Sequence, residues 1–120
     1  MTVRNINMIE EKEVPAGTAT HIQVLISSQE GPHFAMRRFV IQSGGGMPLH
    51  TNTLEHEQYV LTGQAKVQIG SEVHFVKQGD VVFIPEGIPH SYFNNGKGDF
   101  VFLCMIPNQL DEIKILNQEC

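Results

Sequence analysis

The stretch that decides the fold is Gly44–Gly63, which reads GGGMPLHTNTLEHEQYVLTG. Three glycines lead toward His50, and a second histidine, His56, opens the run HEQYVL, which becomes apolar before it ends near Gly63. A short run of this kind, with β-favouring residues and a glycine at its end, is typical of a β-strand, so we expect a strand over 56–61. The glycines predict a turn over 43–47, directly ahead of the first imidazole.

A second stretch, GDVVFIPEGIPHSYFNN over 79–95, supplies a third histidine, His90. Its proline and glycine residues indicate a loop between short strands at 81–84 and 90–93. Three imidazoles from separate elements can converge only if the sheet closes on itself, as it does in a small barrel. Neutral imidazole is the commonest protein ligand of first-row transition metals. The histidines therefore suggest a site for one divalent metal (Mn, Fe, Ni, Cu or Zn), although three histidines near turns also fit chance placement.

The rest of the chain also indicates β structure, because residues 18–28 and 34–42 show alternation and the unbroken apolar run over 99–106 indicates a strand buried on both faces. Further strands are predicted over 18–28, 34–42, 65–69, 72–77 and 99–106. Short strands separated by frequent turn signals indicate an all-β sandwich or barrel. The tail over 110–116 fits either a helix or a strand. With no internal repeat and no linker, residues 1–120 are expected to form a single domain.

Composition limits the classes of function. The chain has 120 residues, of which 41% are hydrophobic, enough for one compact core. Its net charge of −5 argues against a nucleic-acid partner and against an anionic membrane surface. The first residues are too acidic for a signal peptide, and two cysteines make no disulfide framework. We expect a cytoplasmic protein whose partner is a small molecule.

The two stretches resemble the two motifs of the cupin superfamily, in its small single-domain form. The second motif, G-x5-P-x-G-x2-H-x3-N, is met at every fixed position over 79–94. The first, G-x5-H-x-H-x3-4-E-x6-G, is met in part over 44–63. The resemblance implies a cupin-type double-stranded β-helix, which is a jelly-roll barrel with a metal inside its mouth. Small cupins of this kind are commonly homodimers.

Two departures from the first motif concern the metal ligands. His56 takes the position of the usual glutamate, as in small thermophile manganese cupins with a four-histidine site, which this chain also resembles locally in the sequences EHE, FAMR and FLCMIP. Asn52 takes the position of the second histidine. An amide oxygen is a weaker ligand than imidazole for these metals. The resemblance thus implies ligation by His50, His56 and His90, and Asn52 is either a weak fourth ligand or the mark of a decayed site.

The resemblance and the strand alternation together suggest further pocket residues. Of the adjacent Arg37 and Arg38 one must face inward, and the aligned family position favours Arg37, with a surface salt bridge as the alternative. Cys104 is either a small core residue or a pocket residue beside the metal. The remaining candidates share a strand face with a residue already named, and they are Gln58, Tyr92 and Phe102. For Tyr92, core packing is the equal alternative.

The sequence holds no motif for a protein nucleophile. It has no G-x-S-x-G, no phosphate-binding loop and no Cys-x-x-Cys. Any catalysis is therefore expected to depend on the metal. The leading hypothesis is a metal-dependent oxygenase that acts on a small organic substrate, and metal-assisted isomerisation or lyase chemistry is a variant of it. The alternatives are a non-catalytic cupin that binds or senses a small ligand, with a degenerate metal site, and a metal-free structural cupin. A fold alone does not decide between them.

Overall fold

The computed structural model describes residues 1–109 and 112–116. Within these ranges the only helix is a short 3-10 helix, η1 (Ile6–Met8), and the remaining regular structure is β. The strands are β1 (Lys12–Glu13), β2 (Thr18–Ile26), β3 (Phe34–Asn52), β4 (His56–Thr62), β5 (Gln64–Ile69), β6 (Glu72–Lys77), β7 (Val81–Ile84), β8 (His90–Phe93), β9 (Phe100–Pro107) and β10 (Ile113–Ile115). The predicted all-β class is confirmed.

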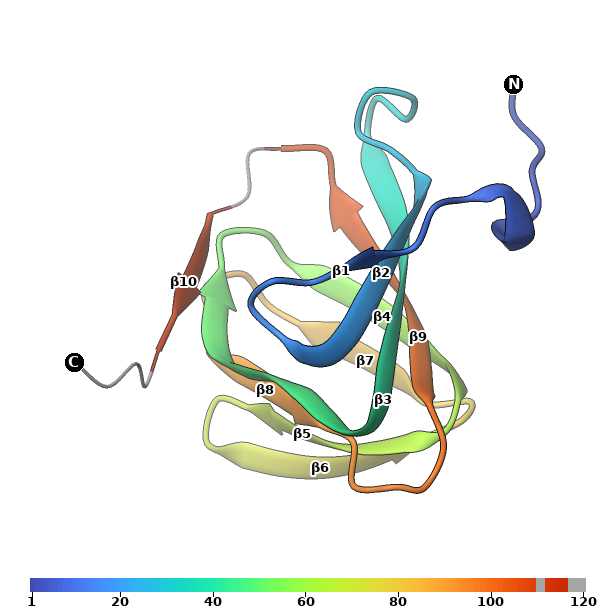
Figure 1. Ribbon diagram of the computed structural model, residues 1–120. Coiled ribbons are helices and arrows are strands. Elements are labelled where there is room, and N and C mark those ends of the chain that lie inside the picture. The colour runs from blue at the N-terminus through green and yellow to red at the C-terminus, as the bar shows by residue number, and fades with distance from the viewer. Residues whose placement is uncertain (110–111, 117–120) are drawn as a thin grey trace.

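The strands form one curled sheet. Its main path runs in the order β6-β5-β8-β3-β9-β4-β7, while β2 and β10 add to β3 and β1 adds to β2. All of the recorded pairings are antiparallel. Figure 1 shows that the sheet folds over so that β5, β6 and β8 lie beneath the other wall, which β2, β3, β9 and β4 build. This is the jelly-roll barrel that the sequence predicts.

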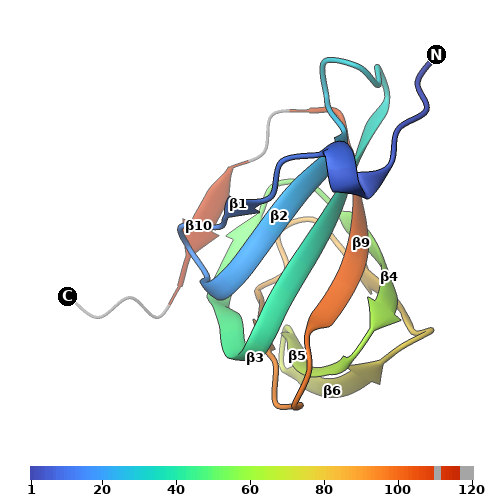
Figure 2. The same cartoon turned by 45° about the vertical axis from the view of Figure 1, so that its right-hand side comes forward.

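Strand β3 belongs to both walls. Its first part, 34–41, pairs with β2 and β9, whereas its second part, 46–52, pairs with β8 and β10 and, at Gly46 alone, with the start of β2. The prediction of a separate glycine turn over 43–47 is wrong, because the chain bends there without leaving the sheet. Gly44 has φ 81°, and a Cβ atom on Gly46 would lie 2.2 Å from the carbonyl oxygen of Tyr92. The glycines therefore let β3 bend sharply, as Figure 2 shows, and pass close to β8.

The core lies between the two walls. Alternate residues of β4 are buried, namely His56, Gln58 and Val60, while Glu57 between them is exposed, as the alternation predicts. Aromatic rings fill the centre, where Phe102 stacks on Phe39 at 5.2 Å and on Tyr92 at 5.4 Å between ring centroids. Strands with one buried and one exposed face thus line the barrel with both apolar and site residues.

Strand β10 closes one side of the barrel mouth. Strand β10 pairs with the second part of β3, so that Ile113 lies opposite Asn52 and Ile115 opposite His50. The ambiguous prediction for 110–116 is resolved as a strand over 113–115, while residues 110–111 lie outside the described ranges. This segment forms a strand and not a helix because its backbone groups pair with the open edge of β3.

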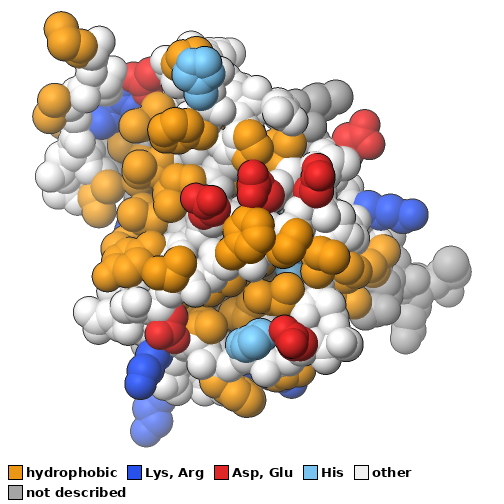
Figure 3. Space-filling model, turned by 180° about the vertical axis from the view of Figure 1, so that it is seen from behind, with side chains coloured by type: hydrophobic (Ala, Val, Ile, Leu, Met, Phe, Trp, Pro, Cys, Tyr) orange, Lys and Arg blue, Asp and Glu red, His pale blue; other side chains and the backbone are white. Residues whose placement is uncertain are grey.

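The outer face of the barrel carries exposed apolar side chains. Tyr59 of β4 lies opposite Val81 of β7, and these side chains are 44% and 77% exposed, with Phe83 on the same strand as Val81 at 54%. Figure 3 shows hydrophobic side chains gathered on this side of the molecule, interrupted by acidic ones. In the described part of the chain no helix is long and apolar enough to span a membrane. The homodimer stays a prediction.

Candidate functional site

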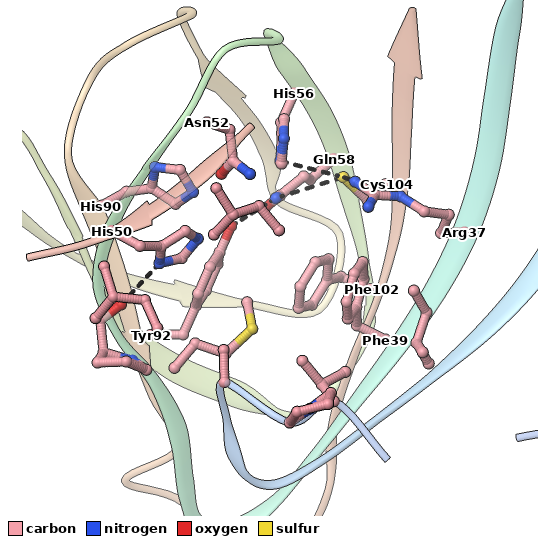
Figure 4. Close-up of a pocket in the computed structure, with 18 of the residues that line it drawn as sticks. Arg37, Phe39, His50, Asn52, His56, Gln58, His90, Tyr92, Phe102 and Cys104 are labelled. Carbon is pink, nitrogen blue, oxygen red and sulfur yellow. Dashed lines mark hydrogen bonds between the residues drawn. The ribbon is translucent and has the colours of Figure 1, made fainter. Parts of the chain in front are cut away.

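A cavity of about 250 Å³ opens between the two walls at the barrel mouth (Figure 4). All of the residues that the sequence suggested for the site line this cavity. They are Arg37, His50, Asn52, His56, Gln58, His90, Tyr92, Phe102 and Cys104. The bent β3 explains how they meet, because it supplies Arg37 from one wall and His50 from the other.

His50 and His90 face each other across neighbouring strands. They form a register pair between β3 and β8, and their ring centroids are 4.2 Å apart. The Nδ1 atom of His50 lies 2.7 Å from the carbonyl oxygen of Pro48, and that of His90 lies 2.9 Å from the carbonyl oxygen of Ile88. A carbonyl oxygen can only accept, so in both rings Nδ1 carries the proton. The lone pair of each neutral ring is therefore on Nε2.

His56 completes the group of imidazoles from β4. Its ring centroid is 5.7 Å from that of His90, and its Nδ1 atom is 3.6 Å from the Sγ atom of Cys104. Its Nε2 atom is buried and has no hydrogen-bond partner in the described part of the chain. Burial, aided by the positive charge of Arg37 and by the other two histidines, lowers the pKa of His56 to about 3. This imidazole is therefore neutral at physiological pH.

Asn52 lies on the same face of β3 as His50, two residues further on. Its side chain lines the cavity between His56 and His90 in Figure 4, and the residue is 5% exposed. Its backbone carbonyl accepts a hydrogen bond of 2.8 Å from the amide of Gly87, which ties the loop before His90 to β3. The position that the family motif gives to a second histidine thus does face the cavity here.

Gln58, Tyr92 and Cys104 form a buried polar group beneath the imidazoles. The Nε2 atom of Gln58 donates to the hydroxyl oxygen of Tyr92 at 2.6 Å and lies 3.8 Å from the Sγ atom of Cys104. Burial, and then the proximity of Cys104, raises the pKa of the Tyr92 phenol above its ordinary value. Cys104 is 1% exposed and lies against His56, so the two roles considered for it, core residue and pocket residue, coincide.

Arg37 is the inward-facing member of the arginine pair. Its Nη2 atom donates to the Sγ atom of Cys104 at 3.2 Å, and its guanidinium carbon lies 5.1 Å from the centroid of the Phe39 ring. Arg38 instead donates to Gln23 Oε1 at 2.9 Å, outside the set of cavity-lining residues. Of the two arginines, Arg37 is thus the one that lines the cavity.

Comparison with known proteins assigns the chain to a family. The family model described as the cupin domain matches residues 37–106, which is more than half of the chain. The chain belongs to the cupin family. No curated protein matches the sequence significantly.

Several solved structures share the fold of this cupin. The polyketide cyclase RemF from Streptomyces resistomycificus is 24% identical, with 99% of this chain and 87% of that chain covered and a TM-score of 0.90. A cupin 2 conserved barrel domain protein from Rhodopseudomonas palustris is 22% identical, with 90% and 77% covered and a TM-score of 0.80. A predicted oxalate decarboxylase from Thermotoga maritima is 24% identical, with 89% and 98% covered and a TM-score of 0.78. At such identities the likeness concerns the fold alone.

The pocket of this cupin has further walls that the sequence did not reveal. The added lining residues are Glu13, Val14, Pro15, Ala16, Ile22, Phe39, Met47, Pro48, Ile113 and Ile115. Phe39 alternates with Arg37, so strand periodicity was a usable signal for it. The N-terminal and C-terminal members have no such signal, because their place depends on pairings with distant strands. Most of these residues are apolar, so the entrance of the cavity is lined mainly by apolar side chains.

The three imidazoles are neighbours in the cavity, but they do not have the geometry of a metal-binding cluster. Across residues 1–109 and 112–116, no three side chains of histidine, cysteine, aspartate or glutamate stand in the arrangement of a metal-binding cluster. The ring separations of 4.2 and 5.7 Å describe neighbours in a shared cavity. The chemistry of the donors nevertheless suits a metal, because the rings are buried and the tautomers of His50 and His90 are fixed by backbone carbonyls.

Proposed function

We propose that this cupin binds one divalent transition metal and acts as a metal-dependent oxygenase on a small organic substrate in the barrel pocket. His50, His56 and His90 would hold the metal, and Asn52 would be a weak fourth ligand. In sequence this ligand set resembles that of the four-histidine manganese cupins, with Asn52 in place of one imidazole.

The orientation of the rings is the observation that carries the proposal. Metal-bound histidines usually donate their other ring nitrogen to a carbonyl or carboxylate, which fixes the tautomer. His50 and His90 do so through Nδ1 to backbone carbonyls at 2.7 and 2.9 Å. A buried nitrogen without a hydrogen-bond partner, as at His56 Nε2, costs free energy unless something binds it. A metal ion would satisfy that atom.

The protein's own residues would prepare the pocket for the reaction. A bound metal would supply a Lewis acid and, if it is redox-active, activation of dioxygen. Gln58 and Tyr92 hold each other in place by the 2.6 Å hydrogen bond and so fix the floor of the cavity. Phe102, at 1% exposure, and the apolar mouth keep bulk water away from the reacting atoms.

A non-catalytic cupin that binds or senses a small ligand is the second candidate. It is favoured by Asn52, which lowers the number of imidazoles, and by imidazole positions that do not form a gathered cluster in the described residues. In this case the cavity would still hold a ligand, but metal occupancy and dioxygen consumption would be low.

Metal analysis of matched variants tests the proposal. The wild-type chain, purified without chelator, is compared with His90→Ala and with His74→Ala, a control histidine on β6 whose side chain is 48% exposed. We expect about one metal ion per wild-type chain, loss of it in His90→Ala and retention in His74→Ala. Dioxygen uptake is then measured with phenols, enols and thiols as substrates.

The outcomes separate the candidates. Metal content that is unchanged in His90→Ala contradicts the ligand assignment. Stoichiometric metal without dioxygen uptake on any substrate class contradicts the oxygenase activity but supports the metal site. A wild-type chain that takes up no added Mn, Fe, Ni, Cu or Zn favours the binding module.

A further inference from the structure

Arg37 is a cation that lines the pocket, and no anion stands beside it in the part of the chain that the structure describes. Among the described residues, no carboxylate lies within 4.0 Å of its guanidinium, and the ion pairs that exist involve other residues. Its Nε atom is buried without a hydrogen-bond partner, and its Nη2 atom donates to a sulfur, which is a weak acceptor. Arg37 is half-buried, and a charge that is partly withdrawn from water is normally paired, so the missing partner requires an explanation.

The other charges around the cavity do not supply that partner. The imidazoles are neutral or positive, and Asn52 and Gln58 are neutral amides. Among the described lining residues the one carboxylate is that of Glu13, which belongs to β1 and is exposed to solvent. Exposed charges are screened by water and salt, so Glu13 contributes little to the field at Arg37. A metal bound to the imidazoles would make the cavity still more positive.

The wall next to Arg37 is aromatic. Phe39 lies under the guanidinium, Phe102 stacks on Phe39 with an interplanar angle of 16°, and Tyr92 continues the stack at the same angle. These rings lie side by side in Figure 4 below the group of imidazoles. Apolar residues from β2 and β10, Ile22, Ile113 and Ile115, continue the lining toward the mouth. Such a wall favours a ligand with a flat apolar body.

We propose that the pocket binds a small planar organic anion, whose anionic oxygen pairs with Arg37 and whose apolar body lies along the aromatic wall. A carboxylate, a phenolate or an enolate shares this chemistry. The cavity of about 250 Å³ limits the body to roughly one or two rings. As a statement about the substrate, this inference rests on the proposed function, because it names the substrate class of the same pocket. Binding of the anion itself requires no metal.

Benzoate binding to the metal-free chain tests the inference. The chain is treated with chelator and titrated with benzoate in a calorimeter, with the neutral benzamide and the non-planar cyclohexanecarboxylate as comparison probes. The variants are Arg37→Gln, Arg37→Lys, which keeps the charge, and Arg38→Gln, which removes the neighbouring charge outside the cavity. Circular dichroism checks that each variant is folded.

We expect benzoate to bind the wild type more tightly than either comparison probe. Arg37→Gln should weaken benzoate binding by about tenfold or more, because a charge-assisted hydrogen bond is lost. The benzoate affinity of Arg37→Lys should lie between those of the wild type and Arg37→Gln. The affinity of Arg38→Gln should match that of the wild type. Equal affinity of the wild type for benzoate and benzamide, or equal benzoate affinity in Arg37→Gln and Arg38→Gln, would overturn the inference. The first comparison needs no variant and so does not depend on the folding of Arg37→Gln.

The result is separable from the metal proposal. If His90→Ala keeps its metal content while benzoate binding depends on Arg37, the ligand assignment fails and the anion site stands. If metal is lost in His90→Ala while the affinity for benzoate is the same in Arg37→Gln as in the wild type, the metal site stands and the anion site fails.

Discussion

The Nδ1 atom of His56 lies 3.6 Å from the Sγ atom of Cys104, between strands β4 and β9. Both residues are almost fully buried, at 6% and 1% exposure. The contact turns the Nε2 atom of His56 away from the sulfur, and the Arg37 guanidinium that donates to the same sulfur adds a positive charge nearby. The imidazole is therefore held in an environment that opposes its protonation.

This environment makes the stability of the metal-free chain depend on pH. The pKa of His56 is about 3 in the folded chain, against about 6.5 for an unperturbed histidine in the unfolded chain. The unfolded state binds the proton first, so the contribution is present above pH 6.5 and is lost as the pH falls toward 3. We expect the free energy of unfolding to drop by about 2 kcal/mol between pH 7 and pH 5 from this residue.

Urea denaturation of chelator-treated protein measures this drop. The comparison is between the wild type, His56→Gln, which lacks the titrating group, and His74→Gln, which changes an exposed histidine. The slope of stability against pH should flatten in His56→Gln and stay unchanged in His74→Gln. Identical slopes in all three proteins would contradict a neutral, buried His56.

The hydrogen bond between Gln58 and Tyr92 should be visible in stability. Tyr92→Phe removes the phenol oxygen that accepts from Gln58 Nε2 at 2.6 Å and leaves a buried amide donor with poorer partners. We expect a loss of about 1–2 kcal/mol in the free energy of unfolding. The chain has two tyrosines, and Tyr59→Phe, at 44% exposure, is the matched control with little expected effect. Equal losses in the two variants would mean that the buried bond contributes nothing.

Asn52→His restores a fourth imidazole to the cavity. Because imidazole is a better ligand than an amide for these metals, affinity for Zn or Ni should rise by about tenfold or more. Thr51→His places the same side chain on the adjacent residue of β3, whose side chain points to the other face. Competition with a chromogenic chelator gives both affinities. A similar gain in Thr51→His would show that an added histidine acts from outside the cavity.

Gly46 is the tightest point of the β3 bend. A methyl group there would lie 2.2 Å from the carbonyl oxygen of Tyr92, so Gly46→Ala must push β3 and β8 apart. We expect a loss of roughly 1–3 kcal/mol by urea denaturation. Gly98→Ala is the control, since a Cβ atom there meets nothing within 4 Å and the backbone needs no positive φ. Wild-type stability in Gly46→Ala would show that the strands can separate without cost.

Local patterns in the sequence were sufficient for most of the strands and for the ring of site residues. The alternation of His56 and Gln58 about Glu57 predicts which side chains face inward, and the structure agrees. The two motif stretches predict that His50 and His90 converge, and they form a register pair. Both successes depend on information that lies within a few residues of the chain.

The features that were missed depend on distant pairing. The bend at Gly44–Gly46 stays within β3 because β8, about 45 residues later, supplies its hydrogen-bond partners. The tail becomes a strand because Ile113–Ile115 meets the edge of β3 near His50. Arg37 was not missed, but its prediction depended on the family position, because alternation alone allows either Arg37 or Arg38 to face inward. The periodicity of a sequence predicts that a segment is a strand, but it does not predict which distant strands pair with it.

Since β3 crosses from one wall to the other, the spacing between Arg37 and His50 is fixed by the length of a single strand. A strand changes face with every residue, so one inserted residue in the bend would turn His50 and Asn52 outward and bring Leu49 and Thr51 in. Insertions or deletions of two residues would keep the faces and change the width of the cavity. Redesign of this barrel for larger or smaller ligands therefore has to proceed in steps of two residues at the bend.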